Sequence, residues 1–281
     1  MMNNISKPPI DLEPLMNVIM GAEMFKTLAT ATKYEIFNAC EEPKTTKEIS
    51  EKLGTDFKMT VKLLNALVSM ELLTKEGDKY KNSQLASTFL VKDKPFYQGD
   101  YIKLEDTGYN VWPRIDQALK EGIKPMKVEE KKSTEKLEEV VDLTFTWAMA
   151  NFAMRGGAKQ VVDAVKDLEE LKKAKRLLDL GCGIGIYSIA LTQTNPSIKG
   201  VLFDIPPVLK IAKDFIEKYG MTNRFELRGG NYIQDDIRGG YDVIFASHTF
   251  YGYPKEMLLV LLKKIYNALN SGGILISNHY S

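Results

Sequence analysis

Residues 176–185, Arg-Leu-Leu-Asp-Leu-Gly-Cys-Gly-Ile-Gly, constrain the fold of this chain more than any other segment. Leucines at 177, 178 and 180 form a short apolar run, which is typical of a strand buried on both faces of a parallel sheet. Glycines follow at 181, 183 and 185. They let the backbone turn sharply and approach a ligand, while the free N–H groups of the next helix face the same point. The segment therefore predicts a nucleotide-type binding site.

The spacing of these glycines indicates which nucleotide. Dinucleotide-binding folds use Gly-x-Gly-x-x-Gly, whereas here the third glycine comes one residue early and Ile186 fills its position. Asp179 lies two residues before the first glycine. Residues 200–204 predict a second strand that ends in Asp204, where a ribose diol needs a bidentate acceptor. The pattern opposes nicotinamide-dependent hydride transfer, which is the alternative enzymatic interpretation.

The C-terminal third of the chain alternates predicted strands with predicted helices. Beyond the first two strands, the expected elements are a helix ending at Gly220, a strand over 224–227, a strand over 241–246, a helix over 254–269 and a strand over 274–277. Repeated strand–helix units with right-handed crossovers build a doubly wound parallel sheet. We therefore expect an α/β, Rossmann-like domain over residues 171–281, with its ligand site at the carboxyl edge of the sheet.

The first 98 residues show a different, mostly helical pattern. Thr45, with Glu48 three residues later, forms a capping box at the start of a helix. The segments 72–75 and 79–81 flank a Glu-Gly-Asp turn and predict a hairpin. Helices followed by a hairpin predict a winged-helix domain over residues 1–98.

A winged helix can bind DNA or pack against another protein chain. No arginine precedes Arg114, so the commonest reader of guanine is missing, and the helix near 57–70 has only a narrow polar stripe. The rest of that helix is apolar, and a large apolar patch usually marks an interface. We therefore expect a homodimer through this domain and no nucleic-acid partner, with DNA binding as the alternative.

Composition bears on several other classes of protein. Basic and acidic residues number 38 and 37, so no overall field favours nucleic acid or an anionic membrane. The sequence contains no run of about 18 apolar residues and no signal-peptide pattern, so we expect neither membrane insertion nor secretion. Cys40 lies in a helical pattern and Cys182 in the glycine turn, so neither a disulfide framework nor a metal site is predicted. We expect a cytoplasmic location.

The order of these features resembles the small-molecule O-methyltransferases of the class I, S-adenosylmethionine-dependent type, typified by the plant caffeic acid and animal hydroxyindole enzymes. The resemblance covers nearly the whole chain and rests on the winged module, Asp179-x-Gly-x-Gly-x-Gly, Asp204-Ile-Pro, Gly230-Asn-Tyr and Gly-Gly before the last strand. It implies S-adenosylmethionine as cofactor, a small aromatic or planar acceptor, transfer to oxygen, and a dimerisation role for the winged module. Nitrogen, carbon and sulfur acceptors stay open.

The resemblance also implies which residues hold the cofactor. The glycine turn would approach the methionine part, Asp204 would bind the ribose hydroxyls, and the loop after the third strand would contact adenine. Asn231 replaces the aspartate of that loop, and its amide oxygen can still accept a hydrogen bond from adenine. The expected cofactor residues are Asp179, Gly181, Gly183, Gly185, Asp204, Gly230, Asn231, Tyr232 and Ser247.

Large side chains before the cofactor domain are candidates for an acceptor pocket. Residues 99–170 are expected to form a helical connector that roofs this pocket, although the same side chains would equally suit a hydrophobic core. The expected pocket residues are Trp112, Trp147, Met149, Phe152 and, after the fourth strand, Phe250.

The sequence departs from the family at the general base. The family places a histidine four residues after the end of the fourth strand, and that position holds Tyr251. A tyrosine with an ordinary pKa of about 10 accepts a proton poorly at neutral pH. We expect His279, in the place of the family's glutamate after the fifth strand, to accept the proton, with Tyr251 orienting the substrate and His248 in reserve. A regulator that binds the cofactor without methyl transfer is the alternative.

The last residues show a second departure from the family. The family has a further helix and an antiparallel hairpin after the fifth strand, whereas this sequence stops at Ser281. Residues 274–276 would then leave an uncovered apolar edge, which natural sheets avoid. We therefore expect that the natural protein continues beyond Ser281.

Overall fold

The structure is a computed structural model, and the residues that it describes are 9–122, 143–251 and 253–279. The chain divides into two compact units, Met1–Ile115 and Asp116–Ser281. The finer division that the sequence suggests, into residues 1–98, 99–170 and 171–281, stays a prediction. Among the described residues, none of the helices combines the length and the apolar character that crossing a membrane requires.

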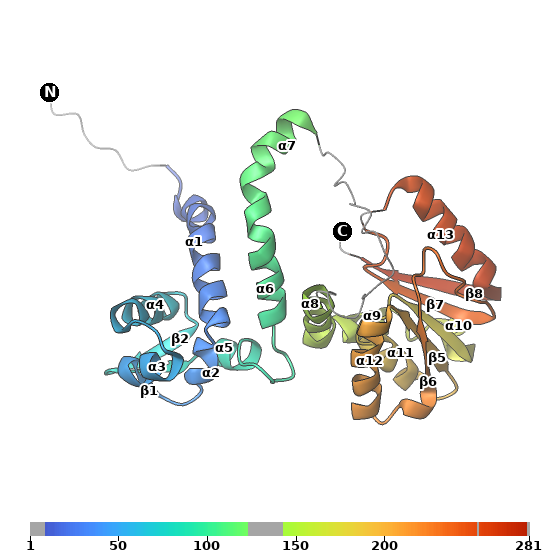
Figure 1. The fold of residues 1–281 in the computed structure, drawn as a ribbon, viewed down its shortest axis with the longest axis horizontal. Coiled ribbons are helices and arrows are strands. Elements are labelled where there is room, and N and C mark those ends of the chain that lie inside the picture. Colours follow the sequence, from blue (N-terminus) through green and yellow to red (C-terminus); the bar gives the residue numbers. More distant parts are fainter. Residues whose placement is uncertain (1–8, 123–142, 252, 280–281) are drawn as a thin grey trace. The chain divides into compact units, whose positions relative to one another are not determined.

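The first unit is mostly helical and contains a small antiparallel sheet (Figure 1). Its helices are α1 (Glu13–Lys33), α2 (Ile36–Ala39), α3 (Thr46–Leu53), α4 (Phe57–Ser69), α5 (Gln84–Phe89) and α6 (Gly99–Gly108), followed by a 3₁₀ helix η1 (Tyr109–Arg114) and, across the boundary, α7 (Ile115–Glu121). Its strands, in sheet order, are β1 (Lys44–Thr45), β3 (Lys79–Asn82) and β2 (Leu73–Glu76). Helices α3 and α4 with the β2–β3 hairpin form the predicted winged helix.

Local sequence explains where helix α3 begins and ends. The Thr45 hydroxyl accepts the Glu48 N–H at 3.3 Å, and the Glu48 carboxylate accepts the Thr45 N–H at 2.7 Å. This is the capping box that the sequence predicts. Gly54 ends the helix in a left-handed conformation with φ +64°.

Helix α1 exposes more large apolar residues than helix α4 does. Much of the apolar side of α4 packs into the unit's own core through Leu64 and Leu67. On α1 the buried residues are Ala29 and Ala31, both near its end. Its exposed apolar residues are Leu15, Met16, Val18, Ile19, Met20 and Met24. A long helix with this much exposed apolar area is typical of an interface.

The second unit is a five-stranded parallel sheet with helices on both faces. Its strands, in sheet order, are β6 (Phe225–Gly229), β5 (Lys199–Asp204), β4 (Arg176–Leu180), β7 (Tyr241–Ser247) and β8 (Leu269–Asn278). Its helices are α8 (Thr144–Phe152), a π-helical turn η2 (Ala153–Gly157), α9 (Ala158–Val165), α10 (Glu169–Lys173), α11 (Ile186–Thr194), α12 (Pro206–Lys218), a 3₁₀ turn η3 (Thr222–Arg224) and α13 (Lys255–Ala268). The strand order reverses beside β4, which confirms the predicted doubly wound fold.

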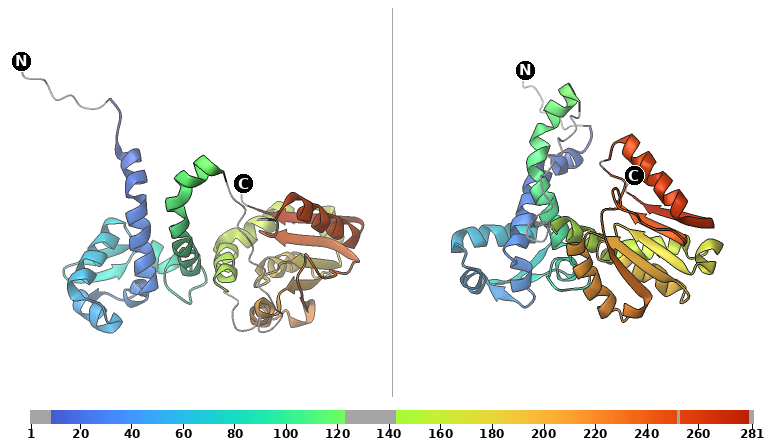
Figure 2. Two further views of the ribbon diagram at one scale, coloured as in Figure 1. Left: turned by 45° about the horizontal axis from the view of Figure 1, so that its top comes forward. Right: turned by 45° about the vertical axis from the view of Figure 1, so that its right-hand side comes forward.

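Neighbouring residues of the central strand pack on opposite faces of the sheet. Leu177 belongs to one buried cluster with residues of α9, α10 and α11. Leu178 belongs to another, with Leu261 and Ile265 of α13. Figure 2 shows α13, in red, along one face of the sheet. Both faces of β4 are therefore buried, as its apolar run predicts, and its carboxyl end delivers the glycine turn to the centre of the sheet edge.

Candidate active site

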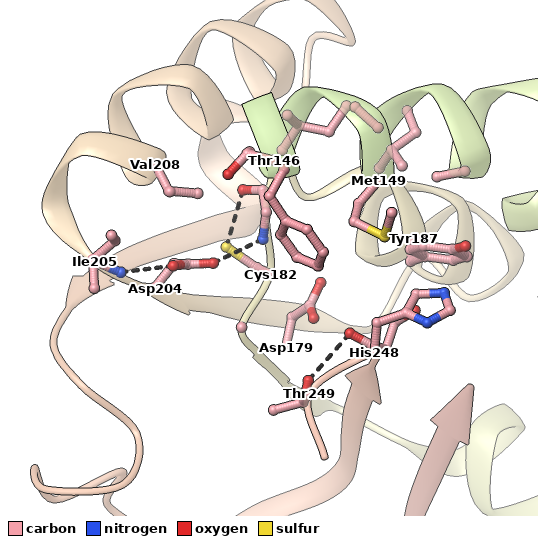
Figure 3. Close-up of a pocket in the computed structure, with 18 of the residues that line it drawn as sticks. Thr146, Met149, Asp179, Cys182, Tyr187, Asp204, Ile205, Val208, His248 and Thr249 are labelled. Atoms are coloured by element: carbon pink, nitrogen blue, oxygen red, sulfur yellow. Dashed lines mark hydrogen bonds between the residues drawn. The ribbon is translucent and has the colours of Figure 1, made fainter. Parts of the chain in front are cut away.

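A cavity of about 300 Å³ lies at the carboxyl edge of this sheet. Its walls come from α8, the β4–α11 turn, the end of β5, the loop after β6 and the end of β7. Figure 3 shows Asp204, Ile205 and Val208 on one side and Met149, Tyr187 and His248 on the other. Among the described residues, no group of three or more His, Cys, Asp or Glu side chains is placed to hold a metal ion.

The glycine turn opens the cavity between these two sides. Gly181, Gly183 and Gly185 have left-handed φ angles of +76°, +54° and +76°. A Cβ atom on Gly183 would have none of the described protein atoms within 4 Å, so a ligand can approach the backbone there. A Cβ atom on Gly185 would lie 2.8 Å from Leu202 Cδ1. Gly183 thus gives access, whereas Gly185 allows helix α11 to pack closely on β5.

Asp204 is held in a fixed orientation at the end of β5. Its Oδ2 accepts the Gly183 N–H at 2.9 Å, and its Oδ1 accepts the Ile205 N–H at 2.8 Å. Burial raises the pKa of this carboxyl, and the two backbone hydrogen bonds oppose that rise. Because each oxygen keeps an unused acceptor site, the carboxylate can still bind a diol.

Asp179 lies at the floor of the cavity and is 1% exposed. Its Oδ2 accepts the Ser188 hydroxyl at 2.7 Å. Burial raises the pKa of Asp179 to about 7, and the nearby Asp204 adds to the rise. A carboxyl with this pKa carries a partial charge at neutral pH, and a positive ligand beside it would increase that charge.

The loop after β6 is held by its own side chains and by a lysine. The Asn231 side-chain oxygen accepts the Ile233 N–H at 2.9 Å, while the Asn231 N–H donates to Asp235 Oδ2 at 2.7 Å. Lys264 of α13 donates to the carbonyls of Tyr232, Ile233 and Asp235 at 3.0, 2.8 and 2.8 Å. No local sequence pattern points to Lys264, because only the packing of α13 brings it against this loop.

Six of the expected cofactor residues line the cavity: Asp179, Gly181, Gly183, Asp204, Tyr232 and Ser247. The remaining three, Gly185, Gly230 and Asn231, are not part of its lining. A Cβ atom on Gly230 would lie 2.7 Å from Phe203 and 3.0 Å from Asp235, so this glycine allows close packing of the loop. The Asn231 oxygen is already engaged within its own loop.

The three candidate catalytic residues meet after β7 and β8. The ring of His279 lies 5.1 Å from that of Tyr251 and 6.1 Å from that of His248, measured between centroids. Tyr251 stacks on His248 at 5.9 Å, and Phe250 stacks on His279 at 5.1 Å. Of these four side chains, His248 lines the cavity.

Both histidines are placed to be neutral at physiological pH. Burial lowers the pKa of His248, and the neighbouring His279 lowers it further. Burial also lowers the pKa of His279. His248 has an unusual left-handed φ of +54°, and its N–H donates to the Asn278 carbonyl at 2.9 Å, which ties the ends of β7 and β8 together. A neutral imidazole on such a rigid support can accept a proton.

The structure places the expected acceptor-pocket residues in different surroundings. Met149 lines the cavity from α8. Trp147 packs against the ring of Phe215 at 6.2 Å within the core, and Phe152 lies under the Arg155 guanidinium at 3.5 Å. Trp112 belongs to the first unit and is 61% exposed there.

Further cavity residues were not foreseen from the sequence. Thr146 lines the cavity beside Phe145 and Met149 of the same helix, and helical spacing from Met149 could have found it. Tyr187 and Thr249 also line it. Tyr187 follows the glycine turn and Thr249 follows the end of β7, and these positions could have indicated that both line the cavity.

Comparison with known proteins gives two family matches. Residues 131–279 match the O-methyltransferase domain, and residues 16–92 match the O-methyltransferase dimerisation domain. An uncharacterized protein of Methanocaldococcus jannaschii is 30% identical over 268 residues, which are 94% of this chain and 68% of that protein.

Two further relatives have described activities. Bovine acetylserotonin O-methyltransferase is 27% identical over 273 residues, which are 93% of this chain and 77% of that enzyme. The crystal structure of human N-acetylserotonin methyltransferase in complex with SAM shares the fold, with a TM-score of 0.79 at 22% identity. That match covers 98% of this chain and 81% of the human one.

Proposed function

The chain belongs to the O-methyltransferase family and is an S-adenosylmethionine-dependent methyltransferase; from that premise we propose that it methylates an oxygen of a small aromatic molecule within this cavity. One observation carries the proposal. A single cavity joins the glycine turn and Asp204 on one side to His248 on the other. Cofactor and acceptor would therefore meet over the carboxyl end of β4, and the bovine relative's activity supports an aromatic acceptor.

The residues on the Asp204 side fit the cofactor. The Asp204 carboxylate would accept the ribose hydroxyls, Ile205 and Val208 would pack against adenine, and the open backbone at Gly183 would admit the methionine part. Bound S-adenosylmethionine supplies a sulfonium methyl group for in-line displacement. The protein's contribution is to align the acceptor with that methyl group and to exclude water.

Asp179 would respond to the charge of the cofactor. The sulfonium of S-adenosylmethionine is positive, whereas the product S-adenosylhomocysteine lacks that charge. A positive ligand over the buried Asp179 carboxyl would lower its raised pKa and favour its ionised form. This carboxyl would thus favour binding of the cofactor over binding of its product.

The proton of a phenolic acceptor would leave through the histidine pair. His248 is the side chain of the pair that lines the cavity, and His279 contacts both His248 and Tyr251. We propose His248 as the group nearest the acceptor, with His279 as the competing base and Tyr251 as an orienting group. The variants His248→Ala, His279→Ala and Tyr251→Phe test these three roles.

Assembly forms the second part of the proposal. Residues 16–92 match a dimerisation domain, and α1 within that range exposes a row of large apolar residues. We infer a homodimer through this surface, with no nucleic-acid partner. Light scattering at micromolar concentration should give the mass of two chains, and a monomer would contradict this inference.

Two measurements test the catalytic proposal. Titration with S-adenosylhomocysteine should give saturable heat, and NADH should give none. Incubation with methyl-labelled S-adenosylmethionine and a panel of phenols should give a labelled methyl ether by mass spectrometry. Binding of NADH instead of S-adenosylhomocysteine would overturn the proposal, and label on nitrogen or carbon would reassign the acceptor atom.

A further inference from the structure

Three polar side chains from three different elements meet at the wall of the cavity. Tyr187 lies in the first turn of α11, Ser247 ends β7 and Asn278 ends β8. The Asn278 amide donates to the Ser247 hydroxyl at 3.0 Å and to the Tyr187 hydroxyl at 3.4 Å. We call Tyr187, Ser247 and Asn278 the hydroxyl–amide cluster.

The surroundings hold this cluster in one arrangement. Tyr187 is 9% exposed, and its ring packs on Phe245 at 5.3 Å. A Cβ atom on Gly157 would lie 3.0 Å from the Tyr187 hydroxyl and 2.8 Å from the Phe152 carbonyl, so the absence of a side chain at 157 makes room for the tyrosine. The Asn278 backbone is held by the His248 N–H.

A count of hydrogens shows what the cluster offers to a ligand. The amide carries two polar hydrogens and each hydroxyl carries one, which makes four. The cluster has two mutual hydrogen bonds, Asn278–Ser247 and Asn278–Tyr187, and both use a hydrogen of the amide. A bond between the two hydroxyls would use one hydrogen more, and the other hydroxyl would keep its own. At least one hydrogen therefore has no acceptor inside the cluster. Because Asn278 donates to both hydroxyls, the surplus hydrogen is on Ser247 or Tyr187, and both residues line the cavity.

The position of the cluster favours the acceptor rather than the nucleoside as its ligand, although the family resemblance gives Ser247 as a cofactor residue. Across the sheet edge, Asp204 ends β5, the glycine turn follows β4, and Ser247 ends β7. Adjacent strands are about 4.8 Å apart, so Ser247 lies about 10 Å across the edge from Asp204. Tyr187 stands beside Met149 and His248 in Figure 3, on the side away from Asp204.

We propose that the hydroxyl–amide cluster is a specificity subsite that donates a hydrogen bond to a second oxygen of the acceptor molecule, such as a carbonyl, distinct from the oxygen that is methylated. Ser247 presents the hydrogen, and Tyr187 and Asn278 are positioning residues that hold it. This inference rests on the proposed function. An acceptor that lacks the second oxygen leaves the half-buried Ser247 donor without this hydrogen bond, which lowers affinity by about tenfold.

Matched pairs of phenols test the subsite. The three hydroxyacetophenone isomers are each paired with the ethylphenol of the same substitution pattern, which replaces the carbonyl by a methylene group. Each is titrated into protein saturated with S-adenosylhomocysteine at a pH where all the phenols are neutral. At least one hydroxyacetophenone should bind about tenfold more tightly than its ethylphenol partner. Equal binding within every pair, or no binding of either member, would overturn the proposal.

Variants then locate the donor. Ser247→Ala should abolish the preference for the ketone, Ser247→Thr should keep it, and Tyr187→Phe should reduce it. The matched control Tyr266→Phe, on the exposed face of α13, should leave it unchanged. The ratio within a pair is informative, because a merely structural defect lowers both affinities together. An unchanged ratio in Ser247→Ala would overturn the proposal.

A further measurement shows whether the cluster donates its hydrogen bond to the acceptor or to the cofactor. The methionine carboxylate of the cofactor is also an oxygen acceptor, so the affinity for S-adenosylhomocysteine is measured in every variant. It should stay within about twofold of the wild-type value. A loss of that affinity in Ser247→Ala, with the ketone preference intact, would assign the donor to the cofactor and overturn the subsite. Failure of the wild-type protein to bind S-adenosylhomocysteine would instead contradict the proposed function itself.

Discussion

The two sides of the cavity are held by different kinds of interaction. On the Asp204 side, backbone groups do most of the holding: two N–H groups fix the carboxylate, and a glycine turn lets the chain come close to a ligand. On the His248 side, side chains hold other side chains, through stacked rings and through the hydroxyl–amide cluster. Backbone geometry tolerates many changes of side chain, whereas a network of side chains changes with each of them. We therefore expect the first side to keep one ligand and the second to vary among relatives.

Removal of the general base on the His248 side of the cavity should have the largest effect. His248→Ala should lower kcat by about 10² to 10⁴, because general-base help is lost while the cofactor side is untouched. Single-turnover rates with labelled S-adenosylmethionine measure this, and His279→Ala and Tyr251→Phe are the matched comparisons. If His279→Ala lost all activity and His248→Ala stayed active, the general base would be His279, as the sequence alone suggests.

The same base predicts a pH profile. The pKa of each histidine is lowered below its ordinary value, and the base works only when it is deprotonated. The rate should therefore be lost as the pH falls, with a midpoint below the ordinary histidine pKa of about 6.5. A midpoint well above that value would point to a different group.

The next effect probes the backbone-held side. Asp204→Ala should weaken S-adenosylhomocysteine binding by about 1 to 3 kcal/mol, because the ribose loses a charged acceptor. Calorimetry measures the loss, and the exposed Asp236→Ala is the matched control. If Asp204→Ala bound S-adenosylhomocysteine as well as the wild type does, the Asp204 side of the cavity would not be the cofactor side.

A smaller effect should follow from loosening the loop after β6. Lys264→Met keeps the packing of the side-chain stem but removes the donors to three carbonyls. S-adenosylhomocysteine affinity should fall by severalfold, up to about tenfold. Lys263→Met on the same helix is the control. Equal effects of the two changes would show that the loop needs no such support.

The last effect is on stability rather than on ligand binding, and it concerns Asp179, whose pKa is raised to about 7 in the folded protein. The unfolded value is about 3.9, so the folded state keeps a proton that the unfolded state has already lost. The stabilising contribution of the protonated form is full below about pH 4 and is lost as the pH rises through about 7. Asp179→Asn should therefore gain stability relative to the wild type over that window, by up to about 4 kcal/mol, in urea titrations. A constant difference across the pH range would contradict the raised pKa.

The difference between the two sides also decides what could be predicted from the sequence. The strand, the turn and Asp204 depend on a contiguous motif and a short spacing, so the fold and most of the cofactor-side lining follow from them. Gly185 obeys the same motif, yet it serves helix packing against Leu202, because a pattern of glycines does not say which one faces the ligand.

The other side depends on contacts between distant residues. Tyr187 and Asn278 are 91 positions apart, and no local pattern brings them together. Trp147 suited either a pocket or a core, and only the packing of α8 against Phe215 places it in the core. Lys264 is one of two adjacent lysines on α13, and sequence does not distinguish the one that supports the loop.

The missing side chain at Gly157 links two positions that are 30 residues apart. Because a side chain at 157 would meet both the Tyr187 hydroxyl and the Phe152 carbonyl, glycine is needed there wherever Tyr187 is present. A smaller residue at 187 would relieve only the first of these two contacts, so Gly157→Ala would crowd the Phe152 carbonyl in either background. A lineage could therefore exchange Tyr187 while it keeps Gly157, and so shift to acceptors of a different shape without altering its cofactor.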